Sequence, residues 1–328
     1  MEVWDYTNTY EWMKRAADLG PVIITCAING GIQGKESHVG LPETPRELAA
    51  AAHEAYSAGA SIVHIHGRSP DNWADCTDDP MVFWEINRRI REACPDVIIN
   101  NSTGGGPNTT MEDRLRNLDA MPEVASLNMG PDMSRFAVKE RSAPLEDPHP
   151  NQEFDLCIPF TYGFIEQLAA AMQERGIKPE MEVYHGGQYW VAQELMGKGL
   201  VEPPYWYQYV MGYQTSNYPT PWNVIDLVRE LPGGSAFSTI GIGRFQWPMV
   251  TTGLLLGGHV RVGLEDNLYL RRGQKLAGNA EAVEKVARIA RELNREVATP
   301  AQTREILGLP SKPSSYTAPR QPTGAAAS

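Results

Sequence analysis

The chain has 328 residues, of which 42% are hydrophobic and 21% are charged, so its composition is that of a folded globular protein. Its 40 acidic and 29 basic residues give a net charge of −11, which argues against nucleic acid or an anionic membrane as the main partner. There is no apolar run near the roughly 18–20 residues of a membrane span, no visible secretory signal and no C-x-x-C pair among the four cysteines, so we expect a reduced, cytoplasmic protein.

Short β-branched runs alternate with longer Ala-rich or amphipathic runs along most of the chain. In chain order, strands are predicted at 21–27, 61–66, 97–102, 124–129, 181–184, 206–211, 236–242 and 260–264. Helices are predicted between and after them, at 45–57, 80–93, 111–118, 164–175, 190–196, 221–231, 248–256 and 280–294. Strict alternation implies a parallel sheet covered by helices. Eight such units match a closed (β/α)₈ TIM barrel better than an open doubly wound sheet.

Three segments lie outside the eight units. Residues 1–20 form an N-terminal extension with some helical character, before a barrel domain that we place at 21–309. Residues 131–163 form a long connection after the fourth strand, at the end of the barrel where such enzymes keep their chemistry. Residues 310–328, rich in Pro, Ser, Thr and Ala, predict an exposed or disordered tail.

Two histidines near the end of the second strand are the sharpest chemical feature. His64 and His66 are two residues apart on a strand, so both imidazoles point to one face and can bind one metal ion. Glu265, after the eighth strand, can add a carboxylate ligand, and His₂Glu with an open position is a catalytic zinc arrangement. His185 and His259 are weaker candidates, since His259 begins its strand at the other end of the barrel. The alternative is a pair of structural histidines packed in the barrel interior.

A basic and an acidic residue accompany Glu265. Arg261 shares a strand face with it, and Asp266 follows directly. A buried arginine keeps a neighbouring carboxylate ionised, which suits a base beside a metal-bound substrate. A structural ion pair that closes the barrel is an equal alternative.

Two glycine-containing loops are candidate anion sites. The run after the third strand offers hydroxyls and exposed N–H groups for a carboxylate or phosphate, from Ser102, Thr103 and Gly104, although a flexible turn explains it as well. Arg244 follows the seventh strand, where barrels often bind phosphate, and is a candidate for holding a phosphate-bearing cosubstrate. Its Gly-Ile-Gly-Arg run is not a dinucleotide fingerprint. Asn128 ends the fourth strand at the same end of the barrel.

Aromatic residues surround the sixth strand. They are Tyr205, Trp206, Tyr207, Tyr209, Tyr213, Tyr218 and Trp222. The simpler interpretation is barrel packing and subunit contact; the functional one is a wall for an aromatic ring or a quaternary ammonium group.

Taken together, these motifs resemble the beta-keto acid cleavage enzyme family. The similar runs extend in order from about residue 21 to about residue 307. They include 41–45, 63–68, 102–105, 126–130, 182–184, 241–244 and, most specifically, 257–267.

The resemblance implies a zinc-dependent TIM barrel, with another divalent metal possible, that converts a 3-keto acid and acetyl-CoA into acetoacetate and a new acyl-CoA. It implies zinc ligation by His64, His66 and Glu265, a catalytic pair of Arg261 and Asp266, and contact of Ser102 with the substrate carboxylate. Substrate contacts are also expected from Thr103, Gly104, Asn128 and Arg244. A homo-oligomer, a dimer or tetramer, is expected too.

The chain departs from the family pattern at two positions. Ile32 stands where some members carry an acidic residue, and Pro131 stands where some carry Thr. Loss of the acidic residue argues against an amino-substituted keto acid. With the aromatic cluster, both changes favour a bulky apolar or aryl substrate tail.

Three other functions compete with this interpretation. A metal-dependent hydrolase of the barrel type usually places its His-x-His on the first strand and needs further histidines on strands five and six, and strand six has none here. A metal-dependent aldolase that acts without CoA shares nearly all of the site chemistry. A non-catalytic binding protein has no need of the clustered His, Glu, Arg and Asp residues.

Overall fold

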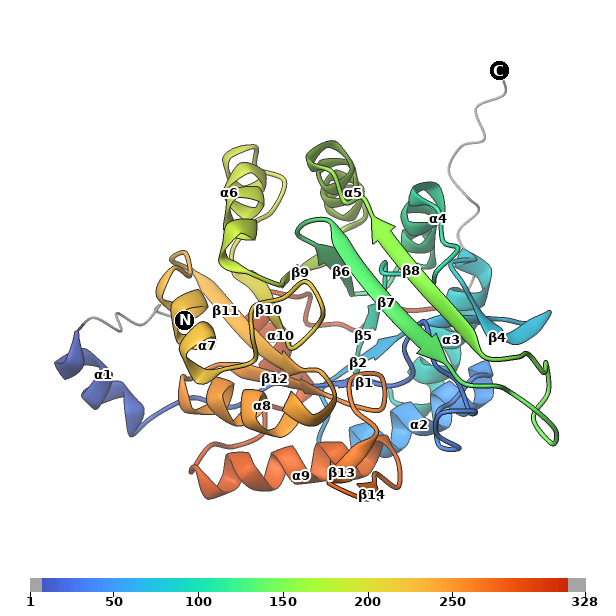
Figure 1. Cartoon of the computed structure of the whole chain (residues 1–328). Coiled ribbons are helices and arrows are strands. Elements are labelled where there is room, and N and C mark those ends of the chain that lie inside the picture. Colours follow the sequence, from blue (N-terminus) through green and yellow to red (C-terminus); the bar gives the residue numbers. More distant parts are fainter. Residues whose placement is uncertain (1–7, 318–328) are drawn as a thin grey trace.

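Eight parallel strands close into a barrel in the computed structural model of the chain, which describes residues 8–317 (Figure 1). Around the barrel the strands are β1 (Ile24–Ala27), β12 (His259–Val262), β11 (Ser235–Gly241), β10 (Tyr205–Met211), β9 (Lys178–Val183), β6 (Val124–Asn128), β5 (Ile98–Asn101) and β2 (Ile62–Ile65). The first strand pairs with both the last and the second, through Ile24 opposite Val260 and Thr25 opposite Ile62. The predicted TIM barrel is therefore confirmed.

Eight helices form the outer ring in Figure 1 and fall where the sequence predicts them. They are α2 (Pro45–Ala58), α3 (Pro80–Ala93), α4 (Met111–Arg116), α5 (Tyr162–Arg175), α6 (Tyr189–Gly197), α7 (Pro221–Arg229), α8 (Gln246–Leu255) and α9 (Asn279–Glu292). In α2, Thr44 and Glu47 form a capping box, and the helix ends at Gly59, whose φ of 118° suits a residue without a side chain. None of the helices within residues 8–317 is long and apolar enough to cross a membrane.

The barrel interior changes from apolar to polar along its axis. An apolar plug fills the end where the strands begin, and α10 (Pro300–Leu307), which was not predicted, contributes to it. The plug consists of Ile23, Ile62, Ile98, Val124, Trp206, Ala236, Ala298 and Leu307. Two residues further along each of several strands, the buried side chains are polar: Asn100, Ser126, Gln208 and Ser238. Alternation on the strands thus directs hydrogen-bonding groups toward the opposite end, the barrel mouth.

Three β-hairpins that the sequence analysis did not predict lie outside the barrel ladder. They are β3 (Gly67–Ser69) with β4 (Asn72–Thr77), β7 (Asp132–Val138) with β8 (Gln152–Ile158), and β13 (Tyr269–Arg271) with β14 (Gln274–Lys275). The long connection expected at 131–163 therefore contains an ordered ribbon, which Figure 1 shows in front of the barrel mouth.

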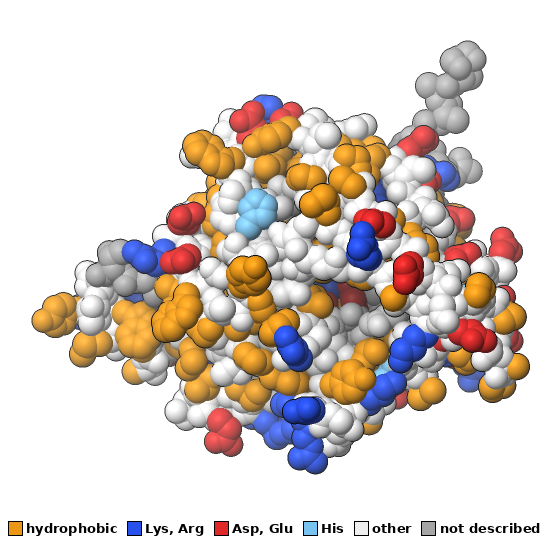
Figure 2. All heavy atoms as spheres, in the orientation of Figure 1, with side chains coloured by type: hydrophobic (Ala, Val, Ile, Leu, Met, Phe, Trp, Pro, Cys, Tyr) orange, Lys and Arg blue, Asp and Glu red, His pale blue; other side chains and the backbone are white. Residues whose placement is uncertain are grey.

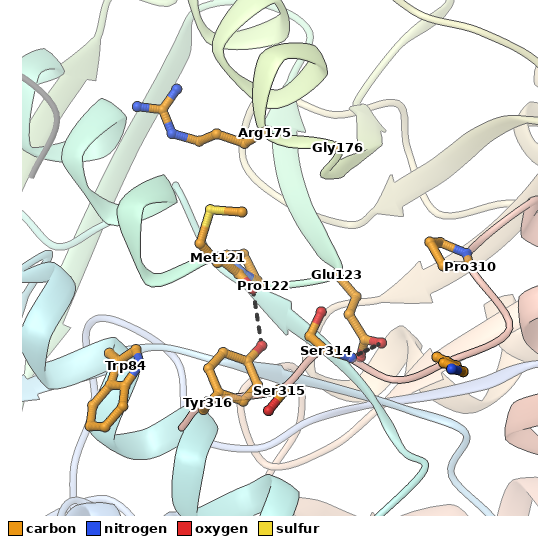
Figure 3. Close-up of a pocket in the computed structure, with 11 residues that line it drawn as sticks. Trp84, Met121, Pro122, Glu123, Arg175, Gly176, Pro310, Ser314, Ser315 and Tyr316 are labelled. Carbon is orange, nitrogen blue, oxygen red and sulfur yellow. Dashed lines mark hydrogen bonds between the residues drawn. The ribbon is translucent and has the colours of Figure 1, made fainter. Parts of the chain in front are cut away.

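The two ends of the described chain differ from each other. In the N-terminal extension, α1 (Thr9–Ala16) confirms the expected helical character, while residues 1–7 lie outside the described part. The expected exposed tail begins later than predicted, because Tyr316 is buried and its hydroxyl donates to the Met121 carbonyl oxygen at 3.1 Å (Figure 3). Nearby, the Ser314 N–H donates to Glu123 Oε1 at 3.1 Å. The rest of the tail prediction, at 318–328, falls outside the described residues.

These tail contacts help to line a cavity of about 290 Å³ beside the start of β6 (Figure 3). Glu123, on its wall, already receives ion pairs from Arg91 and Arg304 at 2.8 and 2.6 Å. This cavity lies at the closed end of the barrel, so it is separate from the site at the mouth.

Candidate active site

The two predicted histidines and Glu265 converge at the mouth of the barrel. His64 Nε2 lies 3.7 Å from Glu265 Oε2, and His66 Nε2 lies 3.4 Å from Glu265 Oε1. Each of the three side chains offers one ligand atom, and these three atoms lie within 4.8 Å of one another. Both histidines are buried. Two imidazoles and one carboxylate in this arrangement match the donor set of a catalytic zinc site.

Glycines make the convergence possible. Gly263 turns the chain sharply after β12 with a φ of 147°, and a Cβ there would lie 2.0 Å from the Ala27 carbonyl oxygen. This close approach lets the Glu265 N–H donate to the same carbonyl at 3.3 Å, which directs the Glu265 side chain back over the barrel. Gly31 is equally confined, since a Cβ would lie 2.9 Å from His66 Nδ1.

Several buried polar atoms in this group lack hydrogen-bond partners among the described residues. They are Nδ1 of His64, Nδ1 of His66 and Oε2 of Glu265. Burying such atoms unpaired is costly, and the unpaired Glu265 Oε2, 3.7 Å from His64 Nε2, fits a site completed by a bound ion. The residues present therefore suit a divalent metal, and zinc in particular by ligand type.

The charges of the group support the same conclusion. Burial lowers the pKa of His64 well below its usual value, with Arg261 adding to the effect. Burial also disfavours protonation of His66, but the neighbouring Glu265 carboxylate outweighs it and raises the His66 pKa to about 10. Because a metal requires neutral imidazoles, ion binding here would release the His66 proton and would weaken in acid.

Arg261 is the centre of a buried carboxylate cluster. Its guanidinium donates to Asp266 Oδ1 at 3.0 Å and to Oδ2 at 3.1 Å, and it also donates to Glu265. Glu182 Oε1 lies 3.5 Å from the third guanidinium nitrogen. Arg261 is 3% exposed and Asp266 is 5% exposed. One cation thus holds three carboxylates, Glu265 among them, in fixed positions beside the two histidines.

These carboxylates differ in their affinity for protons. Burial raises the pKa of Asp266 to about 6, against the opposing charge of Arg261. Burial raises the pKa of Glu182 further, to about 8, because the neighbouring carboxylates of Glu180, Glu265 and Asp266 add to the effect against Arg261. Near neutral pH, Asp266 is mostly a base and Glu182 is mostly an acid. A pair with separated proton affinities is typical of acid–base sites.

Glu182 was not predicted as a site residue. Glu180 and Glu182 occupy alternate positions on β9, so both point into the barrel, and this spacing was the signal available in the sequence. Glu180 is satisfied by Asn100 and Trp206 at 2.7 and 2.9 Å, whereas Glu182 faces the cavity at the mouth.

The cavity has a volume of about 480 Å³ and extends from His64, His66 and Glu265 to the β7–β8 hairpin. Ser102, Gly104 and Asn128, three of the candidate substrate contacts, line it. Asn128 Oδ1 accepts a hydrogen bond from the Tyr184 hydroxyl at 2.8 Å. Thr103 is placed differently, because its hydroxyl donates to the Ser126 carbonyl oxygen at 2.7 Å behind the cavity wall.

The far wall of the cavity is largely apolar and comes from the hairpin. Phe136, Leu156, Ile158 and Phe160 line it, and Ile32 faces the same space from the loop after β1. Pro131 is exposed and does not belong to the lining. The polar exceptions in this region are Asp132 and Ser134, which were not predicted, and Tyr213 of the aromatic cluster, whose hydroxyl donates to Asp132 at 3.1 Å.

Other candidate residues lie away from the cavity. Arg244 is exposed and stacks on Phe245, with 4.9 Å from its guanidinium carbon to the ring centre. His185 is exposed, and His259 Nδ1 accepts from the Ile23 N–H at 3.0 Å at the closed end, where its position was predicted.

Of the aromatic cluster around β10, Tyr213 lines the cavity. Tyr207 and Tyr209 pack in the core between the barrel and its helices, and Trp206 belongs to the apolar plug. Packing therefore accounts for Trp206, Tyr207 and Tyr209, while Tyr213 is the member placed to contact a ligand in the cavity.

Comparison with known proteins gives one consistent family. The sequence profile described as "beta-keto acid cleavage enzyme" matches residues 21–309. The chain is 37% identical over 288 residues to a 3-keto-5-aminohexanoate cleavage enzyme of Acetoanaerobium sticklandii, covering 88% of this chain and 98% of the relative. It is 35% identical over 300 residues to a 3,5-dioxohexanoate:acetyl-CoA acetone transferase of Paraburkholderia graminis, covering 88% and 96%.

A solved structure shares the fold. The apo structure of ObcA superimposes with a TM-score of 0.65 at 20% identity. The match covers 82% of this chain and 66% of that one.

Proposed function

Because the chain belongs to the beta-keto acid cleavage enzyme family, we propose that it converts a 3-keto acid and acetyl-CoA into acetoacetate and a new acyl-CoA at a zinc-dependent site. The observation that carries the proposal is the convergence of His64, His66 and Glu265 beside the buried Arg261–Asp266 pair. Relatives named as acetyl-CoA transferases support the cosubstrate.

His64, His66 and Glu265 would hold the metal, which when bound supplies Lewis-acid polarisation of the 3-keto oxygen. Asp266, held by Arg261, takes a proton from C2 of the keto acid. Ser102 lies on the cavity wall, where its hydroxyl, which accepts from the Gly104 N–H at 3.0 Å, can donate to the substrate carboxylate.

Carbon–carbon bond exchange completes the reaction. The C2 enolate attacks the thioester carbonyl of acetyl-CoA and releases CoA thiolate. The thiolate then adds to the former 3-keto carbon, the C2–C3 bond breaks, and the C2 carbanion regains a proton, leaving acetoacetate and the new acyl-CoA. Glu182, protonated near neutral pH, can donate a hydrogen bond to an oxygen on which negative charge develops.

The cavity wall supports a substrate with a bulky apolar or aryl tail. Ile32, the hairpin side chains Phe136 and Leu156, and Phe160 just after the hairpin provide apolar surface beyond the metal ligands. Ile32 also offers no charge to a cationic substrate end. Such a wall stabilises a ring or a branched chain by removing apolar area from water.

The reaction is tested by mass spectrometry of metal-replete protein with acetyl-CoA and a panel of 3-keto acids, in which aliphatic, aryl and amino-substituted tails are represented. We expect acetoacetate together with the matching acyl-CoA, most rapidly for the bulky apolar and aryl members. Chelation should abolish turnover, and zinc should restore it. Cleavage of the keto acid without CoA would instead identify a metal-dependent aldolase. Faster turnover of short cationic keto acids would refute the proposed tail specificity.

Two further expectations belong with this proposal. All four cysteines are free, which supports a reducing, cytoplasmic location. Exposed aromatic side chains such as Trp190, Tyr218 and Trp222 support a homodimer or homotetramer, which light scattering after size-exclusion chromatography would test.

A further inference from the structure

We infer that the phosphate groups of CoA bind outside the cavity, on a basic surface built by the β13–β14 hairpin and its neighbours. This surface, called the basic rim below, consists of Arg244, Arg271, Arg272, Lys275 and Lys285. The inference rests on the proposed use of acetyl-CoA and adds the location of its charged end.

The basic rim is continuous with the cavity. Tyr269, the first residue of β13, lines the cavity, and Arg271 lies two residues further along the strand, roughly 7 Å away at the usual strand rise. On β14, Lys275 donates to the carbonyl oxygen of Ser37, another lining residue, at 2.7 Å. The hairpin therefore leads from the reacting groups to the outer surface.

Neighbouring elements hold the rim in place. Lys285, on α9, donates to the Leu270 carbonyl oxygen at 2.8 Å and lies 3.8 Å from the ring centre of Trp247. The Trp247 indole N–H in turn donates to the Tyr269 carbonyl oxygen at 3.2 Å. Arg271 Nε donates to Gln274 Oε1 at 2.7 Å, which orients its guanidinium. The short 3₁₀ turn that carries Arg244 packs against β13.

The charges of the basic rim are not neutralised. Among residues 8–317, none of its five cations has a carboxylate oxygen within 4.0 Å. Burial and the neighbouring Arg288 and Arg271 lower the pKa of Lys285, with only Glu281 opposing them. A local positive field of this kind, in a chain with a net charge of −11, favours an anionic ligand.

The opposite side of the barrel mouth, formed by the β7–β8 hairpin, carries more acidic than basic residues. Residues 132–158, which form the β7–β8 hairpin, contain six acidic and three basic residues, whereas 269–288 contain five basic and two acidic residues. Arg135 on that hairpin is paired with Asp155 at 2.6 Å, and nearby Lys35 is paired with Glu47 at 2.6 Å. Figure 2 shows Lys and Arg side chains gathered low on this face, where Figure 1 places α9, β13 and β14. The side of the mouth that carries the basic rim is therefore the more attractive one for a phosphate.

The shape of CoA requires such an outer site. A long, uncharged pantetheine arm separates the thioester from the 3′-phospho-ADP end. The cavity of about 480 Å³ accommodates a ligand of ordinary small-molecule size, so the keto acid and the acyl end of CoA fill it. Guanidinium groups bind phosphate through paired charged hydrogen bonds, which suits Arg271 and Arg272 to the bulk of the negative charge.

The test measures binding directly by isothermal titration calorimetry with CoA, dephospho-CoA and pantetheine. The variant is R271Q/R272Q, and the matched control is R116Q/R229Q, which removes two exposed arginines at the ends of α4 and α7. We expect CoA to bind the R271Q/R272Q variant about tenfold more weakly or worse, because each lost charged hydrogen bond to phosphate costs about this much. Dephospho-CoA should lose less, and pantetheine and the control variant should be unchanged.

Equal CoA affinity of wild type and the R271Q/R272Q variant, with the same melting temperature, would overturn the inference, and so would an equal loss for pantetheine. The outcomes also separate this inference from the proposed reaction. Wild-type protein that binds CoA through the rim but forms no acyl-CoA would refute the reaction and leave the site standing. Turnover by the variant at an unchanged KM for acetyl-CoA would refute the site and leave the reaction standing.

Discussion

Replacing Arg261 with methionine should destabilise the protein in a manner that depends on pH. Arg261 is 3% exposed and compensates Asp266, Glu265 and Glu182 at once. Removing one partner of a buried ion pair costs about 3–5 kcal/mol, because the remaining charge stays buried without compensation. We expect a cost of this size in the free energy of unfolding when the carboxylates are ionised.

The sign of the pH dependence follows from the carboxylates. Arg261 holds the pKa of Glu265 well below its usual value, and it opposes the burial that raises the pKa of Asp266 to about 6 and that of Glu182 to about 8. Without Arg261, all three pKa values rise, so the folded variant binds protons that the unfolded chain does not. As the pH falls, each carboxylate that becomes protonated only in the folded variant restores about 1.4 kcal/mol of its free energy of unfolding per pH unit. The cost should therefore be largest at about pH 8.5 and should shrink by half or more at about pH 6.

The assay is urea unfolding followed by tryptophan fluorescence at both pH values, with a chelator present because a bound cation would itself compensate the carboxylates. Arg68→Met is the matched control. Arg68 is also buried, but its guanidinium donates to the carbonyl oxygens of Gly30, Gln33 and Ala74, which do not titrate. The loss in free energy of unfolding caused by Arg68→Met should therefore be the same at both pH values. An Arg261→Met cost that is constant with pH, or larger in acid, would refute the account of the cluster.

Other substitutions test separate parts of the structure. Glu265→Gln should remove most of the bound zinc, measured by plasma mass spectrometry against wild type, since the one charged ligand is lost. Burial lowers the pKa of His259 to about 3, so below about pH 6.5 the unfolded chain takes up a proton that the folded chain does not. The free energy of unfolding should therefore fall by about 1.4 kcal/mol per pH unit, and His259→Asn should lack this slope in urea titrations. Gly263→Ala should lower the melting temperature strongly and Gly278→Ala hardly at all, because only the first meets a carbonyl oxygen. Phe136→Ala should lower kcat/KM for aryl keto acids about tenfold while leaving zinc content unchanged; an equal loss for short keto acids would contradict its place in the tail wall.

The barrel and the cluster of candidate site residues at its mouth could be predicted from sequence because each depends on local, periodic signals. Buried parallel strands are continuous apolar runs, and the helices between them carry caps such as Thr44 and Gly59. Once β2 and β12 are assigned, alternation places His64 and His66 on one face, and Arg261 on the same inward side of β12. The closing register and the distances around Glu265 are tertiary facts, which no local pattern contains.

The structure adds elements whose sequence signals are weak. The β13–β14 hairpin has strands of three and two residues, too short for any periodicity to be visible. Helix α10 follows the eighth unit and stabilises the barrel by adding Leu307 to the plug at its closed end. Tyr316 is buried through a contact with a residue almost two hundred positions earlier, so a compositional argument for an exposed tail could not detect it.

The β7–β8 hairpin explains why the reaction is easier to predict from this sequence than the substrate. Its inward positions, at Asp132, Ser134 and Phe136, alternate with exposed ones and face the cavity rather than a core. The hairpin pairs only with itself, so its side chains contribute little to barrel closure and are free to suit a ligand. His64 and Arg261, by contrast, lie on strands that the barrel needs in order to close, and Glu265 follows just after one of them. The proposed chemistry therefore uses the part of the chain with the strongest folding constraints, whereas the proposed tail specificity depends on a hairpin with fewer of them. Measured turnover of different keto acids determines which tail the cavity accepts.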